Sequence, residues 1–269
     1  MSRIKPLVKW AGGKTQLLDE LLPLIPKNIN TYYEPFIGGG ALYFALEPKI
    51  AVINDCNVQL INLYKQTRDN LTKLKRQLTR LENAHINSDE YYLMIRDKYN
   101  KCLSKNELSL RSASLFLYLN KAGFNGLYRL NSFGQYNVPS SHKDKIVIYD
   151  RDNLECVSKS LQNTKLLSID FENACANAKK GDFVFFDSPY YNTFDSYQAN
   201  RFSEQDHLRL KQLFDKLSSK NVKCLLTNSN EKFIKDLYKN YDIKVIDVKR
   251  MINCDGKNRI GKEVIIKNY

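Results

Sequence analysis

An acid, a serine, a proline and a tyrosine follow an apolar run in GDFVFFDSPYYNTF (residues 181–194). The four apolar residues before the acid predict a buried strand, and ligands of open α/β sheets bind beyond the carboxyl ends of strands. Pro189 favours an extended Ser188, which would fix the direction of its carbonyl and of the Asp187 carboxylate. These two acceptors could hold an amino group while Tyr190 stacks on the ring that carries it. An ordinary Asp-Ser-Pro turn beside core tyrosines is the alternative.

Glycines in EPFIGGGALYFAL (residues 34–46) indicate a second site. Phe36, Gly38 and Gly40 follow a predicted strand and lead into a predicted helix, where glycine allows a ligand close to the backbone and the helix N-terminus adds positive charge. A tight strand-to-helix connection would also explain them. Asp55 ends the next predicted strand, where a carboxylate can accept hydrogen bonds from ribose hydroxyls. It could instead cap the helix that starts in NVQLINLY.

The segment KWAGGKT (residues 9–15) is similar to the end of a phosphate-binding loop. That loop needs a glycine where this chain has Val8, so a nucleotide hydrolase is disfavoured. A glycine turn before a helix over TQLLDELLPLI is the simpler interpretation.

The elements that must position these residues follow an α/β pattern. Apolar runs alternate with helical periodicity toward both ends of the chain, which predicts a mostly parallel sheet covered by helices. The predicted strands are TYYEPF, AVIND, KLLSI, DFVFF, VKCLL, IKVIDV and EVIIKNY. The last two flank the polar stretch NCDGKNRIGK and should pair antiparallel.

The middle of the chain has a different pattern. Apolar residues recur at helical spacing over residues 57–120. Residues 121–145 combine glycine, asparagine and serine with interleaved cations and aromatics, which predicts a loop or hairpin. We therefore expect a Rossmann-like α/β domain formed by residues 1–56 and 146–269, interrupted by a helical insertion at residues 57–145.

Charge and composition narrow the class of protein. The 269 residues include 42 Lys and Arg against 29 Asp and Glu, a formal net charge of +13, which favours a polyanionic partner such as nucleic acid. No segment has the roughly 18 to 20 apolar residues of a membrane span, and the N-terminus lacks the apolar core of a signal peptide. We therefore expect a cytoplasmic protein. The six cysteines show no C-x-x-C spacing and the three histidines lie far apart, so we expect no metal site.

In combination, these segments resemble the Dam-type DNA adenine methylases. The resemblance rests on KWAGGK, EPFIGGGA, IND, LFLYLNKAGFNGLYRLN, GQYNVP and DSPYY, which occur in that family's order and span nearly the whole chain. It implies an α/β methyltransferase with an inserted DNA-recognition domain. It also implies transfer of a methyl group from S-adenosyl-L-methionine to N6 of adenine in double-stranded DNA, within GATC, on a base flipped out of the duplex.

The resemblance also assigns roles to residues. Those that it places at the cofactor are Trp10, Lys14, Phe36, Gly38, Gly40, Asp55, Asp170, Phe171 and Asp187. Those that it places at the target amino group are Asp187, Ser188, Pro189 and Tyr190. Those that it places on DNA are Lys9, Asn125, Leu127, Arg129 and Pro139. Within the cofactor set, Asp55 would hold the ribose, Asp170 would reach the adenine amino group and Phe171 would pack on the adenine ring.

Arg129 and Lys9 are the expected donors to the guanine edges of GATC, since a bidentate arginine contact discriminates guanine from other bases. A phosphate contact is the alternative for Arg129. Just after NVP the chain reads SSHKDK, where family members commonly have a glycine, a basic residue and a tyrosine. No metal is implied. The expected partners are double-stranded DNA and a companion restriction endonuclease, and we expect a monomer.

The chain departs from the family's usual Asp-Pro-Pro-Tyr motif at Ser188. We expect this position to contribute mainly its backbone carbonyl, which serine retains, so that loss of the proline restraint on φ lowers the rate without abolishing it. Two alternatives stay open at this point. One is methylation of the N4 amino group of cytosine, which uses a similar acidic motif, and the other is a DNA-binding protein of this fold whose turnover Ser188 impairs.

Overall fold

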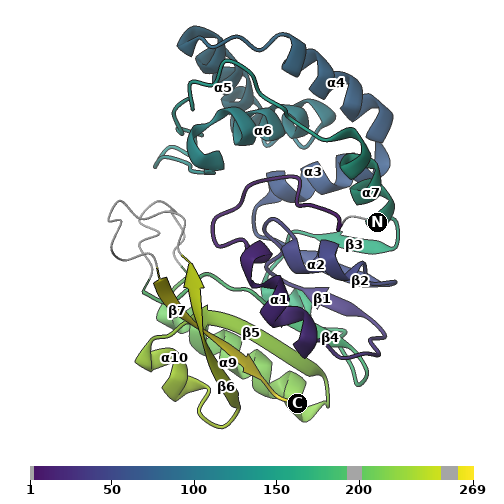
Figure 1. Ribbon diagram of the computed structural model, residues 1–269, viewed down its shortest axis with the longest axis vertical. Helices are drawn as coiled ribbons and strands as arrows, with labels where there is room; N and C mark the ends of the chain where they lie inside the picture. The colour runs from purple at the N-terminus through teal and green to yellow at the C-terminus, as the bar shows by residue number, and fades with distance from the viewer. Residues whose placement is uncertain (1–2, 193–201, 250–259) are drawn as a thin grey trace.

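The computed structural model describes residues 3–192, 202–249 and 260–269. Its centre is a seven-stranded sheet in the order β3-β2-β1-β4-β5-β7-β6 (Figure 1). The strands are β1 (Tyr32–Glu34), β2 (Ala51–Asn54), β3 (Thr164–Leu167), β4 (Phe183–Phe186), β5 (Lys223–Ser229), β6 (Asp242–Lys249) and β7 (Ile260–Lys267). Each strand overlaps one of the predicted apolar runs, with ends that differ by up to three residues.

Most neighbouring strands are parallel. β1 pairs with β2 and β4 in parallel, as β2 does with β3 and β4 with β5. β7 lies between β5 and β6 and runs antiparallel to both. The expected Rossmann-like sheet with an antiparallel last strand is thereby confirmed. Most of the connecting stretch NCDGKNRIGK lies outside the described residues.

Side chains of the strands alternate between two cores on opposite faces of the sheet. In β4, Phe183 and Phe185 join one core, whereas Val184 and Phe186 join the other. Burial on both faces explains why the strands read as continuous apolar runs. The first core is covered by α1 (Leu18–Leu21), α2 (Ala41–Leu46), α3 (Val58–Asp69) and α7 (Arg151–Ser160), and the second by α8 (Phe171–Ala174), α9 (Glu204–Ser219) and α10 (Lys232–Leu237).

A block of helices continues from α3 away from the sheet (Figure 1). It consists of α4 (Leu71–Asn83), α5 (Asp89–Ser104) and α6 (Leu110–Ala122). The first core runs from the sheet through α3 to α6, so the block is packed onto the sheet domain. The division into a catalytic part and an insertion at residues 57–145 stays a prediction. The longest described helices, α5 and α9, have 16 residues, and no described helix is both long and apolar enough to cross a membrane.

After α6 the chain forms η3 (Phe124–Gly126) and then doubles back as a hairpin. Antiparallel bridges join Leu130 to Tyr136 and Gly123 to Ser140. The side chain of Asn131 closes the tip by accepting hydrogen bonds from the backbone N–H groups of residues 133 and 135. Of the predicted loop or hairpin, the bridges show a hairpin.

The segment TQLLDELLPLI is helical as expected, but three short consecutive helices take the place of one continuous α-helix. These are η1 (Lys14–Leu17), α1 and η2 (Leu22–Leu24). Pro23 stands at the start of η2, and proline cannot donate the backbone hydrogen bond that a continuous α-helix needs there. The turns keep Leu17, Leu18 and Leu21 buried in the first core.

Candidate active site

A cavity of about 1850 Å³ opens where the carboxyl ends of β1, β2 and β4 meet. In the sheet, β2 lies on one side of β1 and β4 on the other, so the strand order reverses direction at β1. Such a reversal is the switch point at which open α/β sheets bind ligands. The opposite wall of the cavity is formed by α5 and the hairpin. The volume exceeds the roughly 300–1,000 Å³ of a typical small-molecule pocket, so the cavity has room for two ligand groups.

Asp187, at the end of β4, is held through one of its two carboxylate oxygens. Lys14 Nζ lies 2.8 Å from Oδ1, and Thr227 Oγ1 donates a hydrogen bond of 2.8 Å to the same oxygen. The Lys14 ammonium also donates to the carbonyl of Gly12. No described residue donates to Oδ2 of Asp187, which is therefore placed to accept a hydrogen bond from a ligand. Lys14 pairs with a carboxylate here, which is not the role of the lysine in a phosphate-binding loop.

Tyr190 is oriented at both ends of its side chain. Its hydroxyl donates to Glu263 Oε2 on β7 over 2.6 Å, and Lys14 Nζ lies 4.6 Å from the centroid of its ring. Burial, with the charges of Asp187 and Glu263, raises the pKa of Tyr190, so its hydroxyl stays protonated. The ring lines the cavity beside Asp187.

A second acidic side chain, Glu34 at the end of β1, lies in the same wall. Tyr32 Oη donates to its Oε2 over 2.7 Å. Burial raises the pKa of Glu34 well above its ordinary value, which favours the neutral acid. Lys14 and Asp187 then form the charged pair at the centre of the site. Over the described ranges, no three acidic, histidine or cysteine side chains are grouped to hold a metal ion.

The side chain of Ser188 makes a contact that sequence reasoning omitted. The residue is 2% exposed, and Asn228 Nδ2 donates to its Oγ over 3.3 Å. The expectation that this position supplies mainly a carbonyl was therefore incomplete, because the hydroxyl joins a buried network at the end of β5. Pro189, in contrast, is exposed at the rim of the cavity.

Asp55 ties the glycine-rich segment to the end of β2. Its Oδ2 accepts the N–H of Gly38 and its Oδ1 accepts the N–H of Asn57, each over 2.9 Å. Burial raises the pKa of Asp55, and these hydrogen bonds act in the opposite direction. The cap of α3 is Asn57, whose side chain accepts from the N–H groups of Gln59 and Leu60. The alternative that Asp55 caps this helix is wrong.

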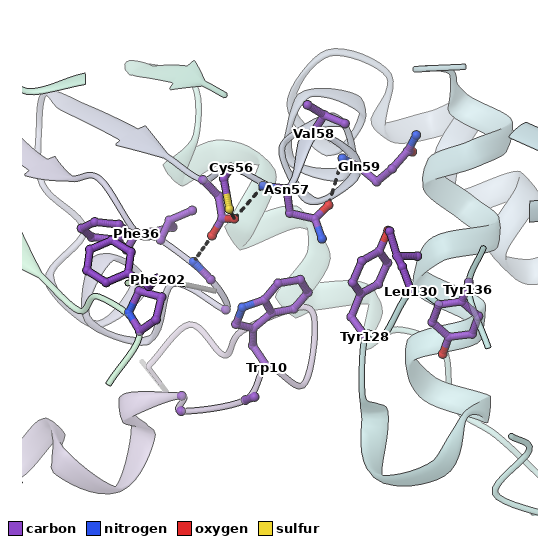
Figure 2. A pocket seen from close by; sticks show the side chains of 18 of the residues that line it. Trp10, Phe36, Cys56, Asn57, Val58, Gln59, Tyr128, Leu130, Tyr136 and Phe202 are labelled. Carbon is purple, nitrogen blue, oxygen red and sulfur yellow. Dashed lines mark hydrogen bonds between the residues drawn. The ribbon is translucent and has the colours of Figure 1, made fainter. Parts of the chain in front are cut away.

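Trp10 lies across the glycine-rich segment. A Cβ added to Gly38 would come within 2.7 Å of Trp10 Cδ1, and the φ of Gly38 is +47°, so glycine is required there. Figure 2 shows Trp10 between Phe36 on one side and Tyr128 on the other. The Trp10 and Tyr128 rings stack with their centroids 5.9 Å apart. Gly40 has a φ of +73° and directly precedes α2, which has six residues.

Two of the expected cofactor residues do not line the cavity. The Phe171 ring packs behind Phe36, with centroids 5.3 Å apart. Asp170 caps α8 by accepting the N–H of Glu172, and its other oxygen lies 2.8 Å from Arg209 Nη2. Their contacts with a cofactor stay predictions.

The residues expected on DNA lie on or beside the hairpin. Asn120 links the start of the hairpin to the N-terminal loop that carries Lys9 and Trp10. Its side chain accepts the N–H of Lys9 over 2.9 Å and donates to the carbonyls of Lys9 and Gly126, each over 2.8 Å. Asn120 is 4% exposed. The loop that carries Trp10 and the start of the hairpin are therefore held together.

The remaining expected DNA residues have different environments. Asn125 is exposed and has a φ of +53°, and Leu127 is half-buried. Pro139 is exposed, and its carbonyl accepts the N–H of Phe124. Arg129 donates from Nε to Asn137 Oδ1 over 2.7 Å and from Nη2 to the Asn137 carbonyl over 3.1 Å.

Several residues of the site were missed by sequence reasoning. Glu34, Thr227 and Asn228 stand at or near the carboxyl ends of β1 and β5. The same rule that selected Asp187 would have found them. Glu263 gave no signal, because an acidic residue in an alternating strand is typical of a solvent-facing position.

Comparisons with known proteins identify the family of this chain. The family model for D12 class N6 adenine-specific DNA methyltransferases matches residues 10–252. The chain is 40% identical to the type II methyltransferase M1.LlaDCHI of Lactococcus lactis subsp. cremoris, over 99% of this chain and 96% of the relative. It is 38% identical to the type II methyltransferase M.MjaIII of Methanocaldococcus jannaschii, over 99% of each chain. It is 30% identical to a DNA adenine methylase of Salmonella typhi, over 100% of this chain and 96% of the relative. The chain therefore belongs to the D12 class of N6 adenine-specific DNA methyltransferases.

Proposed function

We propose that this enzyme methylates N6 of adenine within GATC in double-stranded DNA, with the target base flipped into the cavity described above. The observation that carries the proposal is the meeting of Asp187, Tyr190 and Asp55 in one cavity at the switch point of the sheet. Family membership supports adenine as the target base, which disfavours methylation at N4 of cytosine.

The family implies S-adenosyl-L-methionine as the methyl donor, and the cavity suits it. When bound, this group supplies an activated methyl on a positively charged sulfur. The buried carboxylate of Asp55 keeps lone pairs beyond its two backbone contacts and would accept from the ribose hydroxyls. Trp10, Lys14 and Phe36, with the glycine-rich segment, would form the remaining walls.

Asp187 and Ser188 orient the amino group of adenine. The nitrogen of that group is a weak nucleophile, because its lone pair is delocalised into the ring. Oδ2 of Asp187 and the Ser188 carbonyl accept its two hydrogens, which favours the tetrahedral geometry of the transition state. Once the nitrogen carries the methyl group, it loses one proton along the hydrogen bond to Asp187 and from there to water.

Tyr190 stacks on the flipped adenine. Its ring is fixed by the Glu263 hydrogen bond and the Lys14 ammonium before any base enters. A base that leaves the duplex loses a few kcal/mol of stacking and pairing, and a preoriented aromatic ring restores part of it. Positioning of this kind can lower the barrier by several kcal/mol.

A group of three lysines beside the hairpin, Lys9, Lys121 and Lys143, supports DNA as the substrate. Burial and the nearby charges of Lys9 and Lys143 lower the pKa of Lys121 to about 8. A DNA phosphate would relieve this repulsion and release counterions.

We also propose a monomer in the cytoplasm. Two relatives are named type II methyltransferases, which supports a companion restriction endonuclease that acts on the same site.

Labelled methyl transfer to duplexes tests the proposal. A duplex with one unmethylated GATC should accept label, and digestion should yield N6-methyladenine. Recovery of N4-methylcytosine would show that the target base is cytosine. Label in duplexes without GATC would show that the target sequence is a different one. Binding of S-adenosyl-L-methionine without any transfer to DNA would favour a DNA-binding protein of this fold.

A further inference from the structure

The end of β5 is hydrogen-bonded to the turn that follows β4. The N–H of Tyr191 donates to Asn228 Oδ1 over 3.0 Å, and the carbonyl of Tyr191 accepts from Ser229 Oγ over 2.8 Å. Both backbone groups of the residue after Tyr190 are therefore held by β5. Thr227, in the same strand, holds Asp187 at the other end of the turn.

The amide of Asn228 has only one favourable orientation. Its oxygen accepts the N–H of Tyr191 and also the N–H of Ser229, over 2.8 Å. A flipped amide would set its NH₂ group against these two donors. The nitrogen must then face the opposite way, where Ser188 Oγ accepts its hydrogen over 3.3 Å. Asn228 is 1% exposed and Ser188 is 2% exposed, so water does not readily replace either partner.

We propose that Asn228 is a positioning residue for methyl transfer and that the Ser188 hydroxyl is its required partner. The inference rests on the proposed function and adds residues to the same site. Asn228 acts without touching adenine or cofactor, by fixing the turn that carries Asp187 and Tyr190. Serine in the acidic motif is then a matched partner of Asn228 in this chain, not a weakened proline.

Proline at position 188 has no acceptor for the Asn228 amide. A buried N–H that loses its acceptor is costly, and the amide would relieve the cost by rotating away from Tyr191. The change to the more common motif residue should therefore loosen the turn, although proline itself restricts the backbone. The sequence alone predicted the opposite outcome, because it allowed an argument only from the restraint that proline places on the backbone, and not from the contact of the Ser188 hydroxyl.

A double-mutant cycle tests the pair. Ser188→Pro should lower kcat about tenfold when Asn228 is present, and less than about twofold when Asn228→Ala has already removed the amide. Ser188→Ala removes the hydroxyl without a change in backbone restraint and should act in the same direction, which covers a proline variant that fails to fold. Ser219→Ala, at an exposed serine of α9, is the matched control and should retain the wild-type rate.

The readouts separate positioning from a general loss of structure. The Kd for S-adenosyl-L-methionine, measured by calorimetry, should stay within about twofold of wild type while kcat falls. Wild-type kcat in Ser188→Pro, equal losses in both backgrounds, or a parallel loss of cofactor affinity would each overturn the inference. A wild-type enzyme that forms no methylated adenine would instead remove the proposed function, so the two failures are distinguishable.

Discussion

The ammonium nitrogen of Lys14 lies 2.8 Å from Oδ1 of Asp187, and the two side chains are only 5% and 18% exposed. One residue comes from the N-terminal loop and the other from the end of β4. Because Thr227 donates to the same oxygen, the carboxylate cannot rotate freely. The pair therefore fixes which oxygen of Asp187 faces the cavity.

Asp187→Asn should reduce methyl transfer by more than tenfold while the fold is retained. The variant keeps the shape of the side chain, but it loses the negative charge that pairs with Lys14, and its amide nitrogen cannot accept a hydrogen bond from adenine. Asp187→Ala should be as inactive and less stable than Asp187→Asn, since it also removes the acceptor oxygen that Lys14 and Thr227 share. Single-turnover transfer of labelled methyl, with circular dichroism as the fold control, measures both effects. Turnover above about a tenth of wild type would show that Asp187 is not the amino-group acceptor.

Residues at the ends of parallel strands could be predicted because one rule places them. A strand followed by an acid or a glycine cluster predicted Asp187, Asp55 and Gly38 as site residues, since parallel strands end at one edge of the sheet. All three line the cavity. The apolar runs also gave the strands, because every strand near the centre is buried on both faces.

Contacts between distant segments could not be predicted in this way. The hydrogen bonds of Asn228 to Ser188 and of Glu263 to Tyr190 depend on the β5 and β7 pairings, which no local pattern encodes. Side-chain direction was equally hidden. Asp170 occupies the expected place in sequence, but it pairs with Arg209 on α9 and does not line the cavity.

Asp55→Ala should weaken binding of S-adenosyl-L-methionine at least tenfold and affect DNA binding less. The substitution removes the proposed ribose acceptor and also releases the N–H of Gly38, so the glycine-rich segment loses its tether. Calorimetric titration with the cofactor measures the change. Asp69→Ala removes an exposed acid that pairs with Arg68 and is the control for charge alone. An unchanged Kd in Asp55→Ala would end this assignment.

Stability should fall on acidification because of His207. Burial lowers the pKa of His207 from 6.5 to about 4, with the charges of Asp206 and Glu204 acting in the opposite direction. Between these two pH values the unfolded chain binds a proton that the folded chain does not. The free energy of unfolding therefore decreases as pH falls from about 6.5 toward 4.

His207→Phe tests this source of pH dependence. The His207 ring packs edge-on against Phe202, with centroids 4.8 Å apart, and no described residue bonds to its Nε2, so phenylalanine suits the site. Urea unfolding between pH 7.5 and 5 gives the free energy of unfolding at each pH. The slope of this free energy against pH should be shallower in His207→Phe, by the equivalent of up to one proton. An identical slope in His207→Phe would assign the acid sensitivity elsewhere.

Arg129 is held in a fixed direction on the hairpin by Asn137. Its Nε and Nη2 donate to the side chain and the carbonyl of Asn137, over 2.7 and 3.1 Å. A guanidinium held in this way loses less freedom when it meets a base edge. Such preorganisation suits a bidentate contact with guanine, which discriminates between bases by about 1–3 kcal/mol.

Arg129→Ala should therefore relax the preference at one base pair of GATC more than it weakens binding to random DNA. Arg129→Lys keeps the charge without the planar fork and should lose the same preference, while Asn137→Ala should lose part of it with no change in charge. Initial rates on GATC and on its single-base variants measure the preference. The salt dependence of binding should change by no more than about one unit, because one cation at most leaves the interface. Equal losses on every duplex would make Arg129 a phosphate contact, since phosphate contacts carry no sequence information.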